Sequence, residues 1–149
     1  GWIRQNVAFP NAMVDRITPV TTQADIKTLQ EQFGIKDEWP VTCEPFRQWV
    51  IEDQFPLGRP AWETVGAQFV NNVTPYETMK LRLLNAGHSV LGLLGSIHGH
   101  QTIDGCVADP LFATYLRQFM DIEATPVLAP VEGIDLEARK TTGSTVLEA

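Results

Sequence analysis

The sequence predicts a mainly α-helical fold with one small pair of β-strands. Two long segments, 76–97 and 110–123, carry apolar residues at helical spacing. One stretch, 46–53, has the aromatic and β-branched composition of a strand, and 65–70 is a candidate partner for it. With 149 residues the chain has the length of one domain and can bury a core.

Composition excludes several classes of protein. Hydrophobic residues make up 44% and charged residues 19% of the chain, so it is neither a disordered acidic tail nor a membrane protein. The net charge of −7 disfavours binding to nucleic acid or to an anionic membrane. Cys43 and Cys106 are too few for a disulfide framework, and no signal core or membrane span is visible. We therefore expect reduced thiols and a cytoplasmic protein.

A first helix is expected from residue 21 or 22 to about Phe33. Thr21 or Thr22 can cap its N-terminus, and Gly34 is a natural stop. The segment before it, 9–11, is expected to be a loop, because the residue before a proline is pushed out of the helical region.

The longest helix is expected over 76–97. Pro75 in its first turn and Glu77 near the positive end of the helix dipole favour this start. Its leucines occupy more than one stripe, which predicts a central and buried helix. A second helix over 110–123 presents one apolar face and ends before Pro126.

Three polar residues interrupt the apolar surface of the longest helix: Lys80, Asn85 and His88. At 100° per residue, Asn85 lies about 140° and His88 about 80° round from Lys80, so the three share a sector. A partly desolvated lysine can act as a general base, an amide can donate to an alkoxide, and an imidazole can bind a hydroxyl. Such a set suits the interconversion of an alcohol and a ketone. The alternative is a structural polar network with Lys80 reaching solvent.

No metal site and no nucleotide-binding motif are predicted. His98 and His100 could suggest a metal, but they fall on different helical faces and Gly99 marks the helix end. A zinc site needs three or four convergent ligands. Gly-rich phosphate-binding motifs are absent, so we expect no nucleotide-binding unit within this chain.

Three blocks of sequence, in order, resemble the mannitol dehydrogenase family, the long-chain polyol-specific dehydrogenases. Residues 9–19 read FPNAMVDRITP, and residues 44–53 read EPFRQWVIED and are followed by Gly-Arg-Pro at 58–60. Residues 75–89 read PYETMKLRLLNAGHS and keep the K-x4-N-x2-H spacing of the family's catalytic helix. The resemblance covers roughly residues 2–140.

The resemblance implies an NAD(P)-dependent secondary alcohol dehydrogenase that needs no metal and acts on a polyol or ketose, with D-mannitol and D-fructose favoured. It implies that Lys80 is the general base, that Asn85 stabilises the oxyanion, and that His88 binds a substrate hydroxyl. Val14 and Asp15 match positions that face the NAD or NADP cofactor.

The resemblance also leads us to assign residues 1–140 to part of the family's helical C-terminal catalytic domain. We expect the Rossmann domain, which would bind most of the cofactor, to be absent from this chain. Residues 141–149 depart from the family pattern and are expected to form an irregular tail. On this interpretation the chain alone is inactive, and its exposed cleft face could drive self-association.

Alternatives remain open. Within the family, a uronate reductase such as fructuronate reductase shares these blocks. An anionic substrate would favour an extra cation in the cleft, for which Arg47, Arg59 and Arg82 are candidates. Outside it, the chain could be a non-catalytic helical interaction domain or a degenerate remnant, and in either case Lys80 would be dispensable.

Overall fold

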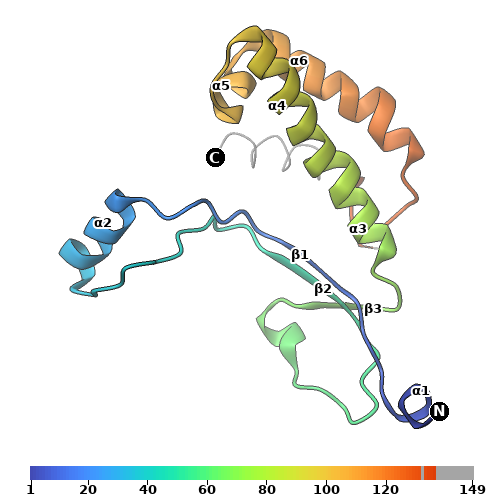
Figure 1. Cartoon of the computed structure of the whole chain (residues 1–149). Helices are drawn as coiled ribbons and strands as arrows, with labels where there is room; N and C mark the ends of the chain where they lie inside the picture. Colours follow the sequence, from blue (N-terminus) through green and yellow to red (C-terminus); the bar gives the residue numbers. More distant parts are fainter. Residues whose placement is uncertain (132, 137–149) are drawn as a thin grey trace.

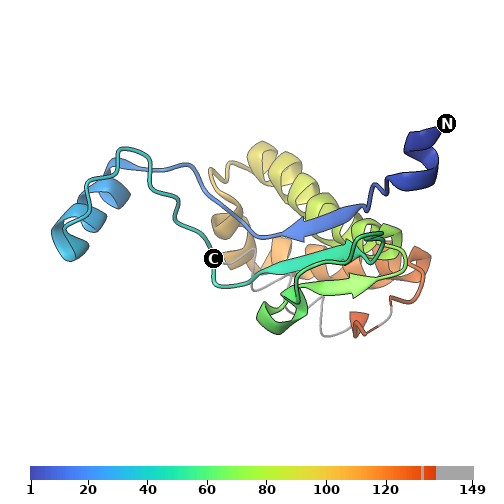
Figure 2. The ribbon, with the colours of Figure 1, turned by 90° about the horizontal axis from the view of Figure 1, so that it is seen from below.

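A three-stranded mixed sheet lies against a layer of helices in the computed structural model, which describes residues 1–131 and 133–136 (Figures 1 and 2). The strands are β1 (Ala12–Asp15), β2 (Gln48–Glu52) and β3 (Gln68–Val70), in the order β1-β2-β3. β1 runs antiparallel to β2, and β2 runs parallel to β3. The central strand therefore joins two segments that are distant in sequence.

This sheet corrects the prediction of a mainly α-helical chain with a single strand pair. The predicted partners 46–53 and 65–70 do pair, as β2 and β3, but residues 12–15 add a third strand. Along β1, Met13 and Asp15 are buried while Val14 is exposed, which is the two-residue alternation of a strand. In the sequence this alternation is masked, because one of the two inward side chains is a carboxylate.

Two helices precede β2. The first, α1 (Trp2–Asn6), is short, and α2 (Gln23–Phe33) lies on a long excursion between β1 and β2, away from the other helices (Figure 1). The predicted bounds of α2 are confirmed: Thr22 and Asp25 form a reciprocal capping box, and Gly34 ends the helix with φ of 68°. None of the residues in α2 is buried.

The helical layer follows the sheet in sequence. A short 3₁₀ turn (Trp62–Val65) precedes β3. One continuous rod then comprises α3 (Thr74–Lys80), a π turn (Leu81–Asn85) and α4 (Ala86–His98). After α5 (Ile103–Ala108), a second rod comprises α6 (Pro110–Gln118), a π turn (Phe119–Ala124) and a 3₁₀ turn (Thr125–Val127). Both long predicted helices are confirmed. No helix of the described part of the chain is long and apolar enough to cross a membrane.

The core lies between the sheet and these two rods. Its most deeply buried side chains are Val50, Met79, Leu91, Cys106 and Met120. Only one stripe of the long rod is buried, since Leu93 and Ile97 are 68% and 84% exposed. The prediction of a central and buried helix therefore holds for only one face of the rod, the face that the sheet, α5 and α6 cover.

Gly95 marks the closest approach of α4 to α5. A Cβ placed there would overlap the Sγ of Cys106, whereas a Cβ at Gly92 would meet only Ile103 Cδ1, at 3.9 Å. Gly95→Ala should therefore lower the free energy of unfolding by ~1–3 kcal/mol through overpacking. Gly92→Ala should be neutral or slightly stabilising, because alanine favours the helix. Urea unfolding of both variants tests this, and equal stabilities would contradict it; adding Cys106→Ala to Gly95→Ala should restore part of the loss.

Glu52 ties the end of β2 to two other segments. It is 8% exposed, its Oε2 accepts from the N–H of Asn11 at 3.0 Å, and its Oε1 accepts from the N–H of Val73 at 3.4 Å. The Asn11 bond is the main reason why the pKa of Glu52 lies below its ordinary value. A lowered pKa in the folded state stabilises the protein above about pH 4.5, and this contribution disappears as the pH falls through the lowered value.

Measuring the unfolding midpoint between about pH 6 and pH 3 for the wild type and Glu52→Gln tests this linkage. The wild type should lose more stability than the variant over this interval. Because the other carboxylates titrate in both proteins, the difference between the two curves gives the contribution of Glu52 to the pH dependence of stability. Parallel curves would show that the Glu52 bonds do not favour its charged form.

Candidate active site

Lys80 and Asp15 meet where the long rod crosses β1. The Nζ of Lys80 lies 3.9 Å from Oδ1 of Asp15. The Asp15 side chain is 3% exposed, and that of Lys80 is 25% exposed. A carboxylate in this position attracts the ammonium group more strongly than one in bulk water, while the lysine stays within reach of a solute. Asp15 thus holds the amine of Lys80 in position at a site that a solute can still reach.

A π turn begins directly after Lys80 and lies between it and His88. Asn85 is the last residue of this turn, and His88 lies in the first turn of α4. Because a π turn holds more residues than an α turn, angles calculated at 100° per residue do not hold across it. Isolated π turns are frequent at functional sites. The structure therefore keeps the three residues on one rod but changes their relative orientation.

His88 has a defined ring orientation. Its Nδ1 lies 3.0 Å from the carbonyl oxygen of Leu84, one turn earlier. A carbonyl can only accept, so Nδ1 carries the proton in the neutral ring and Nε2 is left as an acceptor. His88 is half-buried, whereas Asn85 is exposed. The Nε2 acceptor of His88 and the side-chain amide of Asn85 are thus available further along the rod that carries Lys80.

A pocket of about 280 Å³ lies beside β1. Val14 and Asp15 line it, together with Arg47, Gln48 and Trp49 at the start of β2 and the segment 65–67. Val14 is 59% exposed and presents an apolar surface to it. Both residues predicted to face a cofactor therefore line one pocket, although their side chains point to opposite faces of β1. The buried Asp15 side chain lies near Lys80, which is not among the residues that line the pocket.

The three candidate arginines differ in their contacts. Arg59 donates to Asp53 at 2.8 and 3.1 Å and to Glu63 at 2.7 Å, and its guanidinium lies 3.2 Å from the ring centre of Phe69. Hydrogen bonding to Arg59 holds the pKa of the Asp53 carboxyl below its ordinary value. Arg59 is therefore committed to a structural cluster.

The other two arginines lie apart from that cluster. Arg82 donates to the carbonyl of Val127 at 2.9 Å. Arg47 is exposed and lines the pocket next to Val14 and Asp15. Of the three, Arg47 is therefore placed to meet an anionic group near the candidate site.

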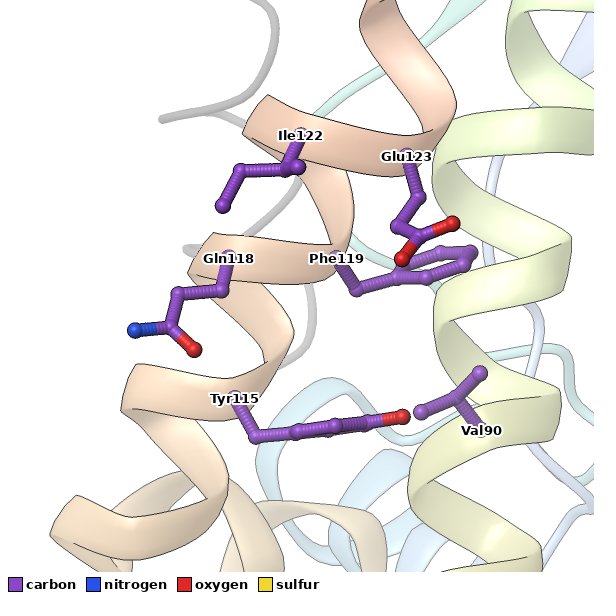
Figure 3. Close-up of a pocket in the computed structure, with 6 residues that line it drawn as sticks. All are labelled: Val90, Tyr115, Gln118, Phe119, Ile122 and Glu123. Carbon is purple, nitrogen blue, oxygen red and sulfur yellow. The ribbon is translucent and has the colours of Figure 1, made fainter.

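A larger hollow of about 360 Å³ lies elsewhere, between α4 and the second rod, where α6 continues into its π turn (Figure 3). The ring of Phe119 points from the π turn after α6 toward α4, and the hydroxyl end of Tyr115 points toward Val90. The remaining lining residues are Gln118, Ile122 and Glu123. No predicted site residue lines this hollow, so its size alone does not mark an active site.

Comparison with known proteins identifies the family of this chain. The family model described as "Mannitol dehydrogenase Rossmann domain" matches residues 1–64, and that described as "Mannitol dehydrogenase C-terminal domain" matches residues 72–142. The two models describe two domains of one dehydrogenase family, and together they match most of this chain. The chain belongs to the mannitol dehydrogenase family.

Several relatives are similar over most of the chain. It is 50% identical to a mannitol 2-dehydrogenase of Aspergillus fumigatus over 91% of its length and 48% identical to D-mannonate oxidoreductase of Escherichia coli over 94%. It covers 28% and 29% of these relatives. The solved Pseudomonas fluorescens mannitol 2-dehydrogenase, a ternary complex with NAD and D-mannitol, is 53% identical with a TM-score of 0.88; the match covers 99% of this chain and 30% of that one. A D-sorbitol dehydrogenase in substrate-free form matches at 37% identity and a TM-score of 0.92, over the same shares.

These matches correct the expectation that the Rossmann domain is absent. Residues 1–64, which include β1, α2 and β2, match the Rossmann domain model. Glycine-rich motifs characterise only the first strand–helix turn of such a domain, so a chain without them can still carry a later part of it. The chain is a mixed α/β part of the family's enzymes. Residues 137–149, which include the predicted tail at 141–149, lie outside the described residues.

Proposed function

We propose that this chain forms one wall of the active site of an NAD(P)-dependent polyol dehydrogenase, with D-mannitol and D-fructose as the favoured substrate pair. The observation that carries the proposal is the contact between Lys80 and the buried Asp15 beside the pocket at β1. Similarity to enzymes named mannitol 2-dehydrogenase supports the substrate class. Because the chain spans about 28% of the first of these relatives, the activity belongs to the larger assembly of both domains.

Lys80 serves as the general base in the proposed reaction. It takes the proton of the substrate hydroxyl as the hydrogen on the same carbon leaves as hydride. The Asp15 carboxylate, at 3.9 Å, then stabilises the ammonium group that has formed. In the reverse direction this ammonium returns the proton to the ketone oxygen. Asn85 donates a hydrogen bond to that oxygen, and Nε2 of His88 accepts one from a neighbouring hydroxyl.

Val14 and Asp15 are proposed to contact the cofactor from this side of the cleft. The exposed, apolar Val14 side chain and the pocket that both residues line suit a flat ring, so the residues present fit a nicotinamide group. The Asp15 carboxylate itself is buried and faces Lys80. When bound, that cofactor supplies the hydride acceptor. The NAD complex of the P. fluorescens relative supports this choice. In the proposed reaction the proton passes to Lys80, as the family resemblance implies, without a metal.

A uronate or mannonate substrate is the second candidate. Arg47 at the pocket and the 48% identity to D-mannonate oxidoreductase favour it. A guanidinium group binds a carboxylate through two parallel hydrogen bonds, which a polyol cannot form. On this second candidate, Arg47→Ala should therefore weaken the binding of a mannonate-type substrate selectively.

The compartment and the assembly belong to the same proposal. Cys43 and Cys106 are free thiols, which supports a reducing cytoplasm. Exposed apolar side chains on the long rod, among them Leu93 and Ile97, support self-association of this chain when other domains are lacking.

The test is a chimera in which residues 1–142 replace the corresponding segment of the P. fluorescens mannitol 2-dehydrogenase. NADH formation is followed with D-mannitol and with D-mannonate. Turnover of mannitol supports the polyol assignment, and turnover of mannonate alone supports the second candidate. A folded chimera that turns over neither would contradict the catalytic proposal and favour a non-catalytic domain.

A further inference from the structure

The junction of α4, α5 and α6 brings together three side chains that the proposed reaction does not use. His98 is the last residue of α4, His100 follows the glycine that caps it, and Asp109 is the N-cap of α6. One potential ligand atom from each lies within 4.8 Å of the others. We propose that these three side chains bind a divalent transition-metal ion such as Zn²⁺.

The backbone explains why two histidines that belong to different helical faces converge. Gly99 has φ of 107°, a left-handed conformation that other residues rarely adopt, and it reverses the chain after α4. The N–H groups of Gly99 and His100 both donate to the carbonyl of Gly95, at 2.9 Å. The His98 and His100 rings consequently stack with centres 5.5 Å apart. Spacing along an ideal helix could not reveal this, because the turn lies outside it.

The third group is positioned independently of the histidines. Oδ1 of Asp109 accepts from the N–H of Leu111 at 2.9 Å, which caps α6, and Oδ2 lies 3.2 Å from Nε2 of His100. One oxygen is used for the cap and the other faces the imidazole.

Phe112 also packs against the two histidine rings. Phe112, which is 6% exposed, contacts both histidine rings edge-on at 5.4 and 5.1 Å. In tetrahedral zinc sites the nitrogen and oxygen ligands lie about 3.3 Å apart, given bonds of about 2.0–2.1 Å. The His100–Asp109 pair already has this separation, at 3.2 Å. A rotation of the exposed His98 ring completes the set, and water fills the fourth position.

The chemistry of the set selects the type of ion. Two imidazoles and one carboxylate suit Zn²⁺, Co²⁺ and Ni²⁺, whereas Mg²⁺ and Ca²⁺ prefer oxygen ligands throughout. The site lies about 27 Å from Lys80 along the rod, at 1.5 Å per residue. The ion would therefore clamp the α4–α5 turn onto the start of α6 and take no part in the proposed proton transfer.

The test uses protein stripped with a chelator and titrated calorimetrically with Zn²⁺, with Mg²⁺ as the hard-cation comparison. The expected result is one Zn²⁺ per chain, with the Kd weakened by ~10-fold or more in His98→Gln, His100→Gln and Asp109→Asn. Asp109→Asn is the critical variant, because asparagine is an equally good N-cap and the helix stays intact. His88→Gln removes the remaining histidine and should leave the affinity unchanged.

Absorption of the Co²⁺-loaded protein identifies the ligands. Bands of a nitrogen and oxygen environment are expected, and thiolate charge-transfer bands would instead indicate Cys43 or Cys106 and overturn the proposal. It would equally be overturned by the lack of saturable Zn²⁺ binding, by unchanged affinity in Asp109→Asn, or by a matching loss in His88→Gln.

Discussion

Replacing Lys80 with alanine in the chimera should lower kcat by ~10²–10⁴-fold, the range typical for loss of a general base. The amine is the proposed proton acceptor, and the Asp15 carboxylate at 3.9 Å cannot replace it without moving. KM should change far less than kcat, because the lost interaction belongs mainly to the transition state. Steady-state kinetics with D-mannitol and NAD provide the measurement.

Two controls separate a lost base from a lost structure. Lys27→Ala removes a lysine that is 72% exposed and pairs with Glu31 at 3.8 Å, and it should leave kcat unchanged. Small primary amines added to Lys80→Ala should restore part of the rate, which a merely structural lysine would not allow. A loss smaller than tenfold, or an equal loss in Lys27→Ala, would rule out the assigned role.

Truncating Leu91 should destabilise the protein more than any other leucine-to-alanine change in the long rod. Its side chain is fully buried at the centre of α4, and the Sγ of Cys106 lies 3.7 Å from its carbonyl. Leu91→Ala should lower the free energy of unfolding by ~2–5 kcal/mol, through lost burial and the cavity left behind. That is a large share of the ~5–15 kcal/mol that stabilises a typical domain. Equilibrium unfolding in urea measures it.

Leu93→Ala is the matched control, because it makes the same chemical change in the same helix. Leu93 is 68% exposed, so the variant should stay within ~0.5 kcal/mol of the wild type. Helix propensity changes equally in both variants and therefore cancels in the comparison. Equal losses would mean that the buried stripe of α4 is not the one that carries Leu91.

The features that could be predicted from sequence are those with local causes. The bounds of α2 follow from the Thr22 cap and the αL glycine Gly34, both within one turn of the helix ends. The long rods follow from apolar spacing. In contrast, α5 escaped prediction because it has only six residues and includes Gly105. The π turns depend on packing, and no local pattern signals them.

The candidate site likewise has a part that could be predicted from sequence and a part that could not. Lys80, Asn85 and His88 could be named from spacing and resemblance, because all three lie on one helix. The contact of Lys80 with Asp15 could not, since it joins a helix to a strand far away in sequence. The grouping of Asp109 with His98 and His100 could not be predicted either, because it depends on the reversal of the chain at Gly99.

By itself, then, the sequence determined the family, the two long helices, the capped α2 and the polar residues of the rod, because periodicity, caps and motif spacing are properties of contiguous residues. Only the tertiary structure decided that residues 12–15 form a strand with a buried carboxylate and that this carboxylate meets Lys80. It also decided which stripe of the rod is buried. Each of these depends on what packs against the segment, and burial is a property of the partner surface as much as of the residue.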